Sequence, residues 1–182
     1  MKKIKFGNIL ILLGVLCILA SGGLFFYNQR ENQHSQDVID VVLPELKKEI
    51  IQHQNEPQTP VENDSPYYGI LVFPTLGIEL PVSREYSEQQ LKETPCVFGG
   101  PDLVICGHAI KAQFAFLKQL SQNDSVFLIL TSGETTEYKV VDSEVLQPTD
   151  IQEMLESGYD LTLFTCTNAN TARYTVRFDK VG

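Results

Sequence analysis

Positive charge is scarce in this chain of 182 residues, which has 14 Lys and Arg residues against 23 Asp and Glu residues. The formal net charge of -9 at pH 7 disfavours binding to nucleic acids and other polyanions. Internal repeats are also absent, which excludes a repeat architecture. Enough apolar material for a packed core is present, since 43% of the residues are hydrophobic and 20% are charged. The length allows one ordinary domain with extensions.

Long hydrophobic runs are absent with one exception, the uncharged segment 6–27. A helix needs about 20 apolar residues to span a bilayer, whereas the apolar part of a signal peptide usually has about 7 to 15. We therefore predict a transmembrane anchor over 6–27 in preference to a cleaved signal peptide. Because three lysines lie in residues 1–5, the positive-inside rule predicts a short cytoplasmic tail and places the rest of the chain outside the cell. The sequence thus predicts a single-pass protein of the cell membrane.

Residues 28–66 lack the pattern of a packed core and are predicted to form a stalk and linker. The piece from Gln36 to His53 has helical spacing, with Pro44 acceptable only at a helix start. Gln54 to Pro66 has three prolines and no hydrophobic period, as expected for a linker. The folded domain is then predicted to occupy 67–182.

This domain alternates short β-type runs with turn residues. Eight runs are predicted as strands: YGILVF, LGIELPV, DLVICGH, SVFLIL, TEYKVV, SEVLQP, LTLFTC and ARYTVRF. Ser132 to Glu134 are predicted to form a hairpin turn, and SEQQLKE, QFAFLKQL and DIQEMLES short helices. A doubly wound parallel sheet would need longer crossover helices. We therefore predict a mainly β fold, a closed or nearly closed eight-stranded β-barrel.

Cysteine and histidine are few, with four and three residues respectively. No two cysteines have CxxC spacing, so a closed zinc site is disfavoured and we predict no metal or other cofactor. Cys106 lies two residues before His108, which leaves a Cys and His metal pair that involves Cys166 as an alternative. Cys96 and Cys106 are predicted to be free thiols, although the outside location also permits a disulfide between them.

His108 and Cys166 each end an apolar strand, LVICGH and LTLFTC. If those strands are neighbours, a thiol and an imidazole meet at the rim of the barrel. Arg173 and Arg177 share one face of the next strand with Thr175, while the alternate residues are predicted to face the core. A thiolate is a nucleophile, and a nearby imidazolium or guanidinium raises its fraction. Taken singly, each of these residues is more often structural.

Together, the segments LTLFTC, VICGH and RYTVRF resemble the sortases, the membrane-anchored cysteine transpeptidases of Gram-positive cell surfaces. The resemblance runs from about Tyr68 to the end, because GILVFPTLGIELPV is similar to the opening strands of the family. The order of His before Cys before Arg also matches the family, whereas papain-like proteases have the Cys first.

The resemblance implies that Cys166 is the nucleophile, His108 the general acid and base, and Arg173 the residue that orients substrate and stabilises the oxyanion. It also implies that Thr165 lines the site, with Arg177 as the alternative for the arginine role. The implied reaction cleaves an LPxTG-like C-terminal sorting signal of a secreted protein after Thr. The acyl group then passes to an amine of a peptidoglycan precursor or a pilin. A hydrolytic cysteine peptidase and an inactive membrane-anchored binding barrel are the alternatives.

The sortase class is less well defined. Asn168 replaces an Asp that is frequent in one class, and Asp64 to Pro66 resemble the lid of pilin-building sortases only faintly. No clear acidic cluster predicts calcium dependence. The short domain is most similar to the smaller housekeeping or sporulation-associated classes, which leaves the subclass open, with a class D-like member as one candidate.

Overall fold

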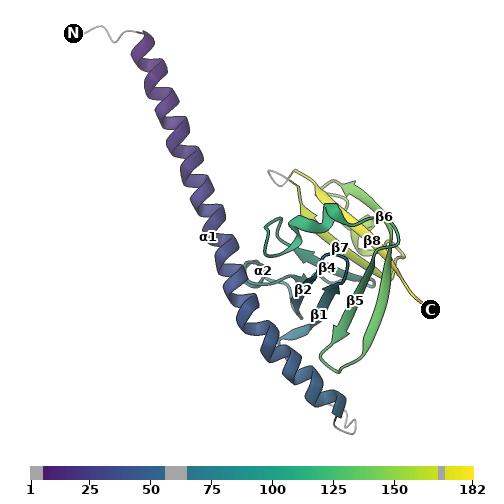
Figure 1. Cartoon of the computed structure of the whole chain (residues 1–182). Helices are drawn as coiled ribbons and strands as arrows, with labels where there is room; N and C mark the ends of the chain where they lie inside the picture. Colours follow the sequence, from purple (N-terminus) through teal and green to yellow (C-terminus); the bar gives the residue numbers. More distant parts are fainter. Residues whose placement is uncertain (1–5, 56–64, 168–170) are drawn as a thin grey trace.

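The computed structural model describes residues 6–55, 65–167 and 171–182, and it has one long helix beside a closed β-barrel (Figure 1). The long helix is α1 (Phe6–Asn55). The strands are β1 (Tyr67–Phe73), β2 (Ile78–Ser83), β3 (Cys96–Val97), β4 (Leu103–Gly107), β5 (Ser125–Leu130), β6 (Thr135–Leu146), β7 (Leu161–Cys166) and β8 (Arg173–Lys180). The short helices are α2 (Glu88–Leu91), the 3-10 helix η1 (Phe114–Gln119) and α3 (Ile151–Leu155).

The barrel closes in the order β1-β2-β3-β4-β7-β8-β6-β5, which confirms the predicted eight-stranded fold. Two pairs, β2 with β3 and β4 with β7, are parallel, and the others are antiparallel. The predicted hairpin turn is also present between β5 and β6, where Gly133 has a φ of 87° that favours glycine.

Two strand predictions need correction. The runs TEYKVV and SEVLQP belong to one continuous strand, β6, whose register on β8 shifts between Val140 and Asp142. This irregularity bends the strand without ending it, which explains why the sequence suggested two strands. The additional strand is β3, which has only two residues and therefore leaves no alternating pattern to recognise.

Two clusters of buried apolar side chains lie on opposite faces of the barrel wall. Because side chains alternate along a strand, Leu161 and Leu163 of β7 belong to the barrel core, whereas Phe164 belongs to the other cluster. We call this second group the outer cluster, and it consists of Cys96, Val104, Cys106, Leu146, Met154 and Phe164. Met154 lies on α3, so this short helix covers part of the outer face.

Helix α1 differs from the predicted stalk. It runs unbroken for 50 residues with Pro44 inside it, although a proline in a helix interior costs about 3 kcal/mol. Packing on the barrel offsets that cost, because Ile39, Leu46 and Ile50 are buried, the last two against Ile70 of β1. Burial of a large apolar side chain contributes about 1.5 to 3 kcal/mol. The second half of α1 is thus part of the folded domain.

The first half of α1 exposes its apolar side chains. One window of this helix is long and apolar enough to cross a membrane, and none of it is buried against the described part of the chain. This arrangement is compatible with the predicted membrane anchor. The predicted cytoplasmic tail 1–5, most of the predicted linker (56–64) and Asn168 lie outside the described residues.

Candidate active site

The parallel pairing of β4 with β7 brings His108 and Cys166 together. Gly107 at the end of β4 is the register partner of Thr165, and His108 and Cys166 are the residues that follow. On the other side of β7, Cys166 is the register partner of Arg173, the first residue of β8. The three predicted catalytic side chains therefore come from the ends of three adjacent strands.

All three side chains line one cavity of about 280 Å³. Outer-cluster residues form part of its lining, among them Cys106 and Phe164. Tyr86 and Phe98 add an aromatic wall, since the Phe98 ring lies edge-on to the rings of Tyr86 and Phe164 at centroid distances of 5.1 and 5.3 Å. Most small-molecule and peptide pockets combine such apolar walls with a few convergent polar groups. Residues from Gln147 to Met154 form another wall of the cavity.

The turn after β4 holds the backbone of His108 firmly. The His108 N–H donates to Oε1 of Gln113 at 2.8 Å, and the His108 carbonyl accepts from the Phe114 N–H at 3.0 Å. Gly107 is required here, because a Cβ at this position would lie 2.6 Å from the Phe114 ring. The backbone of His108 is thus fixed by the loop from Gly107 to Phe114.

Burial is the main cause of a lowered pKa for the His108 imidazole. The carboxylate of Glu31 opposes this shift, with Oε1 at 3.8 Å from Nε2 of His108, and Lys92 adds to it. A lowered pKa leaves more of the imidazole neutral near pH 7. A neutral imidazole is able to accept a proton from a thiol.

Thr165 does not line the cavity. It lies on the core face of β7, opposite to Cys166, and its buried hydroxyl donates to the Gly107 carbonyl at 2.7 Å. This bond fastens the end of β4 to the end of β7. The threonine thereby stabilises the relative position of His108 and Cys166 from the core side of the barrel wall.

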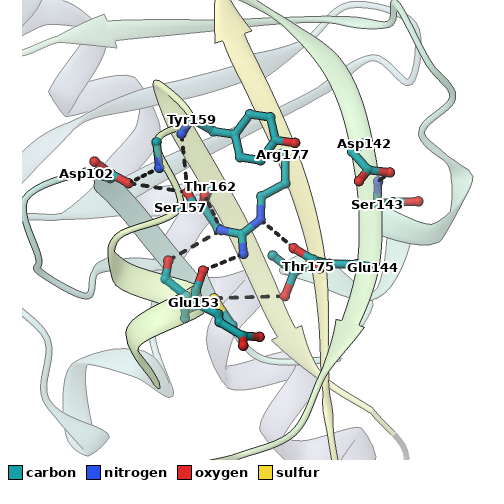
Figure 2. A network of polar contacts seen from close by, with 12 residues as sticks. Asp102, Asp142, Ser143, Glu144, Glu153, Ser157, Tyr159, Thr162, Thr175 and Arg177 are labelled. Atoms are coloured by element: carbon teal, nitrogen blue, oxygen red, sulfur yellow. Dashed lines mark hydrogen bonds and ion pairs between the residues drawn. The ribbon is translucent and has the colours of Figure 1, made fainter. Parts of the chain in front are cut away.

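Arg177 does not line the cavity and lies in a network of polar contacts around α3 (Figure 2). Its side chain is 2% exposed, and Nε donates to Glu144 Oε1 at 2.8 Å. The other guanidinium nitrogens donate to the Thr162 hydroxyl and the Glu153 carbonyl, each at 2.8 Å. Arg177 therefore fastens α3 to the barrel, whereas the half-buried Arg173 lines the cavity with Cys166.

The remaining thiols of the barrel are buried. Cys96 and Cys106 face each other across β3 and β4 as free cysteines. Burial raises the pKa of Cys96 to about 12 and raises the pKa of Cys106 as well. Within the described residues, no group of three His, Cys, Asp or Glu side chains is arranged to hold a metal ion.

Alkylation should distinguish these thiols. With iodoacetamide at pH 8, we expect Cys166 to react more than about a hundredfold faster than Cys96 or Cys106, because only thiolates react and the buried thiols stay protonated. Peptide mass mapping over time gives the three rates. Equal rates would contradict the assignment of Cys166 as the reactive thiol.

Sequence reasoning missed the residues of the cavity wall and Glu31. One part of the wall comes from the loop after β6 and from α3, and the other part comes from α2 and the segments on either side of it. The apolar residues of these short segments show no periodic pattern in the sequence. Glu31 was missed because the segment 28–66 was interpreted as a stalk. The signal available was the helical spacing of Ser35, Ile39, Leu46 and Ile50, all of which are buried in the structure.

Comparison with known proteins bears on the fold and the family of this chain. A search of curated proteins found no match. Among solved structures, the chain is similar to sortase C-1 from Actinomyces oris, with 24% identity and a TM-score of 0.59 over 75% of this chain and 99% of that chain. It is also similar to sortase C from Clostridium perfringens SM101, with 23% identity and a TM-score of 0.55 over 88% of this chain and 99% of that chain.

A third similar structure is a lid mutant of sortase A from Corynebacterium diphtheriae, with 20% identity and a TM-score of 0.57 over 79% of this chain and 95% of that chain. At these identities the likeness shows the fold. The sortase domain family model matches residues 71–181, which is more than half of the chain and includes every strand that lines the cavity. The chain therefore belongs to the sortase family.

Proposed function

We propose that this sortase is a cysteine transpeptidase in which Cys166 is the nucleophile, His108 the general acid and base, and Arg173 the oxyanion-stabilising residue. The observation that supports it most is that a partly buried thiol, an imidazole and a guanidinium line one cavity at the ends of β4, β7 and β8. Each residue type supplies chemistry that acyl transfer needs.

In the first half of the reaction, His108 accepts the thiol proton of Cys166, and the sulfur attacks the carbonyl carbon of a threonine in an LPxTG-like sorting signal. Negative charge then develops on the carbonyl oxygen, where the guanidinium of Arg173 stabilises it. The bond from carbonyl carbon to nitrogen breaks, and the imidazolium gives its proton to the leaving amine. The product is a thioester on Cys166.

In the second half, an acceptor amine attacks the thioester carbonyl. His108 takes a proton from the attacking nitrogen, the bond to sulfur breaks, and a new amide forms. The acceptor belongs to a peptidoglycan precursor or a pilin, and the acyl donor is a secreted protein with a C-terminal sorting signal. The aromatic wall around Phe98 provides an apolar surface for the leucine and proline of such a signal.

The proposed topology follows from the same chemistry. Residues 1–5 are cytoplasmic, 6–27 cross the membrane, and the catalytic barrel 67–182 lies outside the cell, where secreted substrates and precursor meet. The exposed apolar window of α1 supports this topology. Neither a nucleic acid nor a cofactor takes part in the proposed reaction.

The test is a product analysis with the full chain in detergent. It is incubated with a peptide that contains an LPxTG sequence, with and without triglycine as acceptor, and the products are identified by mass. We expect the amide between the threonine carbonyl and triglycine to be the main product when triglycine is present. Threonine acid as the main product in both reactions would indicate a hydrolytic peptidase. No product from a library of sorting peptides would indicate an inactive binding barrel.

A further inference from the structure

Helix α1 reaches the loop that carries His108. At this level, the helix presents three polar side chains to the barrel, namely Glu31, Asn32 and Ser35. Further along α1, the contacts are apolar and include Ile39. The change from apolar to polar contacts occurs where α1 passes the candidate active site.

Two of these polar side chains bind the backbone and side chains of the loop. The Oδ1 atom of Asn32 accepts from the Ala112 N–H at 2.9 Å. The Ser35 hydroxyl accepts from Nε2 of Gln113 at 3.0 Å and donates to the Glu93 carbonyl at 2.8 Å. Since Gln113 is fully buried and its Oε1 accepts from the His108 N–H, α1 is connected to the backbone of the proposed catalytic base.

The third side chain approaches the imidazole ring itself. Oε1 of Glu31 lies 3.8 Å from Nε2 of His108, and the two side chains are only 22% and 31% exposed. Partial burial weakens the screening by water and salt that makes most surface ion pairs ineffective. Ser35 fixes the register of α1, so Glu31 is held against the ring in a defined position.

We propose that Glu31 is a positioning residue that orients the His108 ring and stabilises the imidazolium formed during each half-reaction. This inference rests on the proposed function, in which His108 carries the proton. A carboxylate beside a catalytic imidazole has both effects, because its charge attracts the protonated ring and its position restricts ring rotation.

Other charged and titratable groups around His108 also influence the protonation of its ring. Lys92, which follows α2, acts against protonation of His108, and so does burial, whereas Glu31 favours it. Cys166 and Arg173 share the cavity with the ring. Removal of the Glu31 charge should therefore lower the pKa of His108 further and leave the imidazolium less stable.

The experiment compares Glu31→Gln with Asp37→Asn in the full chain embedded in nanodiscs. Asp37 is a matched control, since it is an exposed carboxylate on the same helix that accepts a hydrogen bond from Gln33. For Glu31→Gln, we expect kcat to fall about tenfold with KM within about twofold of the original value, because the lost charge stabilises the imidazolium formed in each half-reaction and does not bind the substrate. Asp37→Asn should retain the original kcat.

NMR titration of ¹³C-labelled histidine supplies the second measurement, with the His108 signal identified by its loss in His108→Asn. The His108 pKa should fall in Glu31→Gln and stay constant in Asp37→Asn. An unchanged kcat in Glu31→Gln overturns the inference. A lower kcat with an unchanged His108 pKa and a lower melting temperature also overturns it, because the residue then only holds the helix. If the original chain forms no amide product, the proposed function fails, and the NMR comparison still decides whether Glu31 acts on His108.

Discussion

Replacing Cys166 with alanine will abolish the thioester and the amide product together. We expect the rate of transfer to triglycine to fall by at least about 10⁴-fold, because the other thiol that lines the cavity, Cys106, is buried and stays protonated, and the uncatalysed reaction is slow. Cys166→Ser should be nearly as inactive, since a hydroxyl group is far less ionised than a thiol at neutral pH. Product mass and the mass of the trapped acyl adduct on the protein are the measurements.

The control for this result is Cys17→Ala. Cys17 is a free cysteine of α1 within the predicted anchor, so its loss should leave the transfer rate unchanged within about twofold. Both variants should have nearly the same melting temperature as the original chain, because Cys166 is only partly buried and Cys17 is exposed. Retention of transfer by Cys166→Ala would refute the proposed nucleophile.

Changing each arginine of β8 to methionine should have different effects, on activity for Arg173 and on stability for Arg177. Arg173→Met should lose activity by about 10² to 10³-fold with little change in stability, because its guanidinium lines the cavity where the oxyanion would develop. Arg177→Met should reduce the free energy of unfolding by about 2 to 4 kcal/mol, because it leaves Thr162, Glu144 and the Glu153 carbonyl without a donor.

Urea unfolding and transfer kinetics on the same two variants measure both effects. Glu144 is 39% exposed and regains water when Arg177 is lost, which is why we do not expect the larger cost of a fully buried charge. Methionine has a similar volume and therefore limits cavity formation. A stable but inactive Arg177→Met together with an active Arg173→Met would reverse the assignment of the two residues.

Most of the barrel was predictable because every strand except β3 has five or more residues of β-type sequence. β4 and β7 carry apolar runs that end at His108 and Cys166, and these runs also show where the side chains of the site emerge. The pairing of β4 with β7 does not follow from either run alone. The sequence leaves this pairing as a condition for the site, and the structure shows that the two strands are parallel neighbours.

The roles of the two arginines were not predictable from strand alternation. Arg173 and Arg177 share one face of β8, so the pattern treats them alike. What distinguishes them is α3, which covers Arg177 through the Glu153 carbonyl and leaves Arg173 beside the cavity. The partners of Arg177 lie 15 to 33 residues away in the sequence, and no local pattern links them to it.

The full length of α1 was not predictable from the sequence, because proline usually ends or kinks a helix. Pro44 suggested a helix start, whereas the packing of Leu46 and Ile50 on β1 keeps the helix intact. Such tertiary contacts override local propensity and are invisible in a short window of sequence. The same oversight concealed Glu31, because a stalk has no reason to contact His108.

An unbroken helix that packs on the barrel also fixes the distance between the barrel and the predicted membrane anchor. A helix rises ~1.5 Å per residue, so Glu31 lies only ~6 Å beyond Tyr27 along the axis. With 6–27 in the bilayer, the sulfur of Cys166 would lie at the level of the lipid headgroups. The barrel could not change its distance from the membrane, because no flexible linker separates it from the membrane-spanning part of α1. Substrates would have to present the bond to be cut at that fixed height, which favours donors and acceptors that are themselves held at the lipid surface.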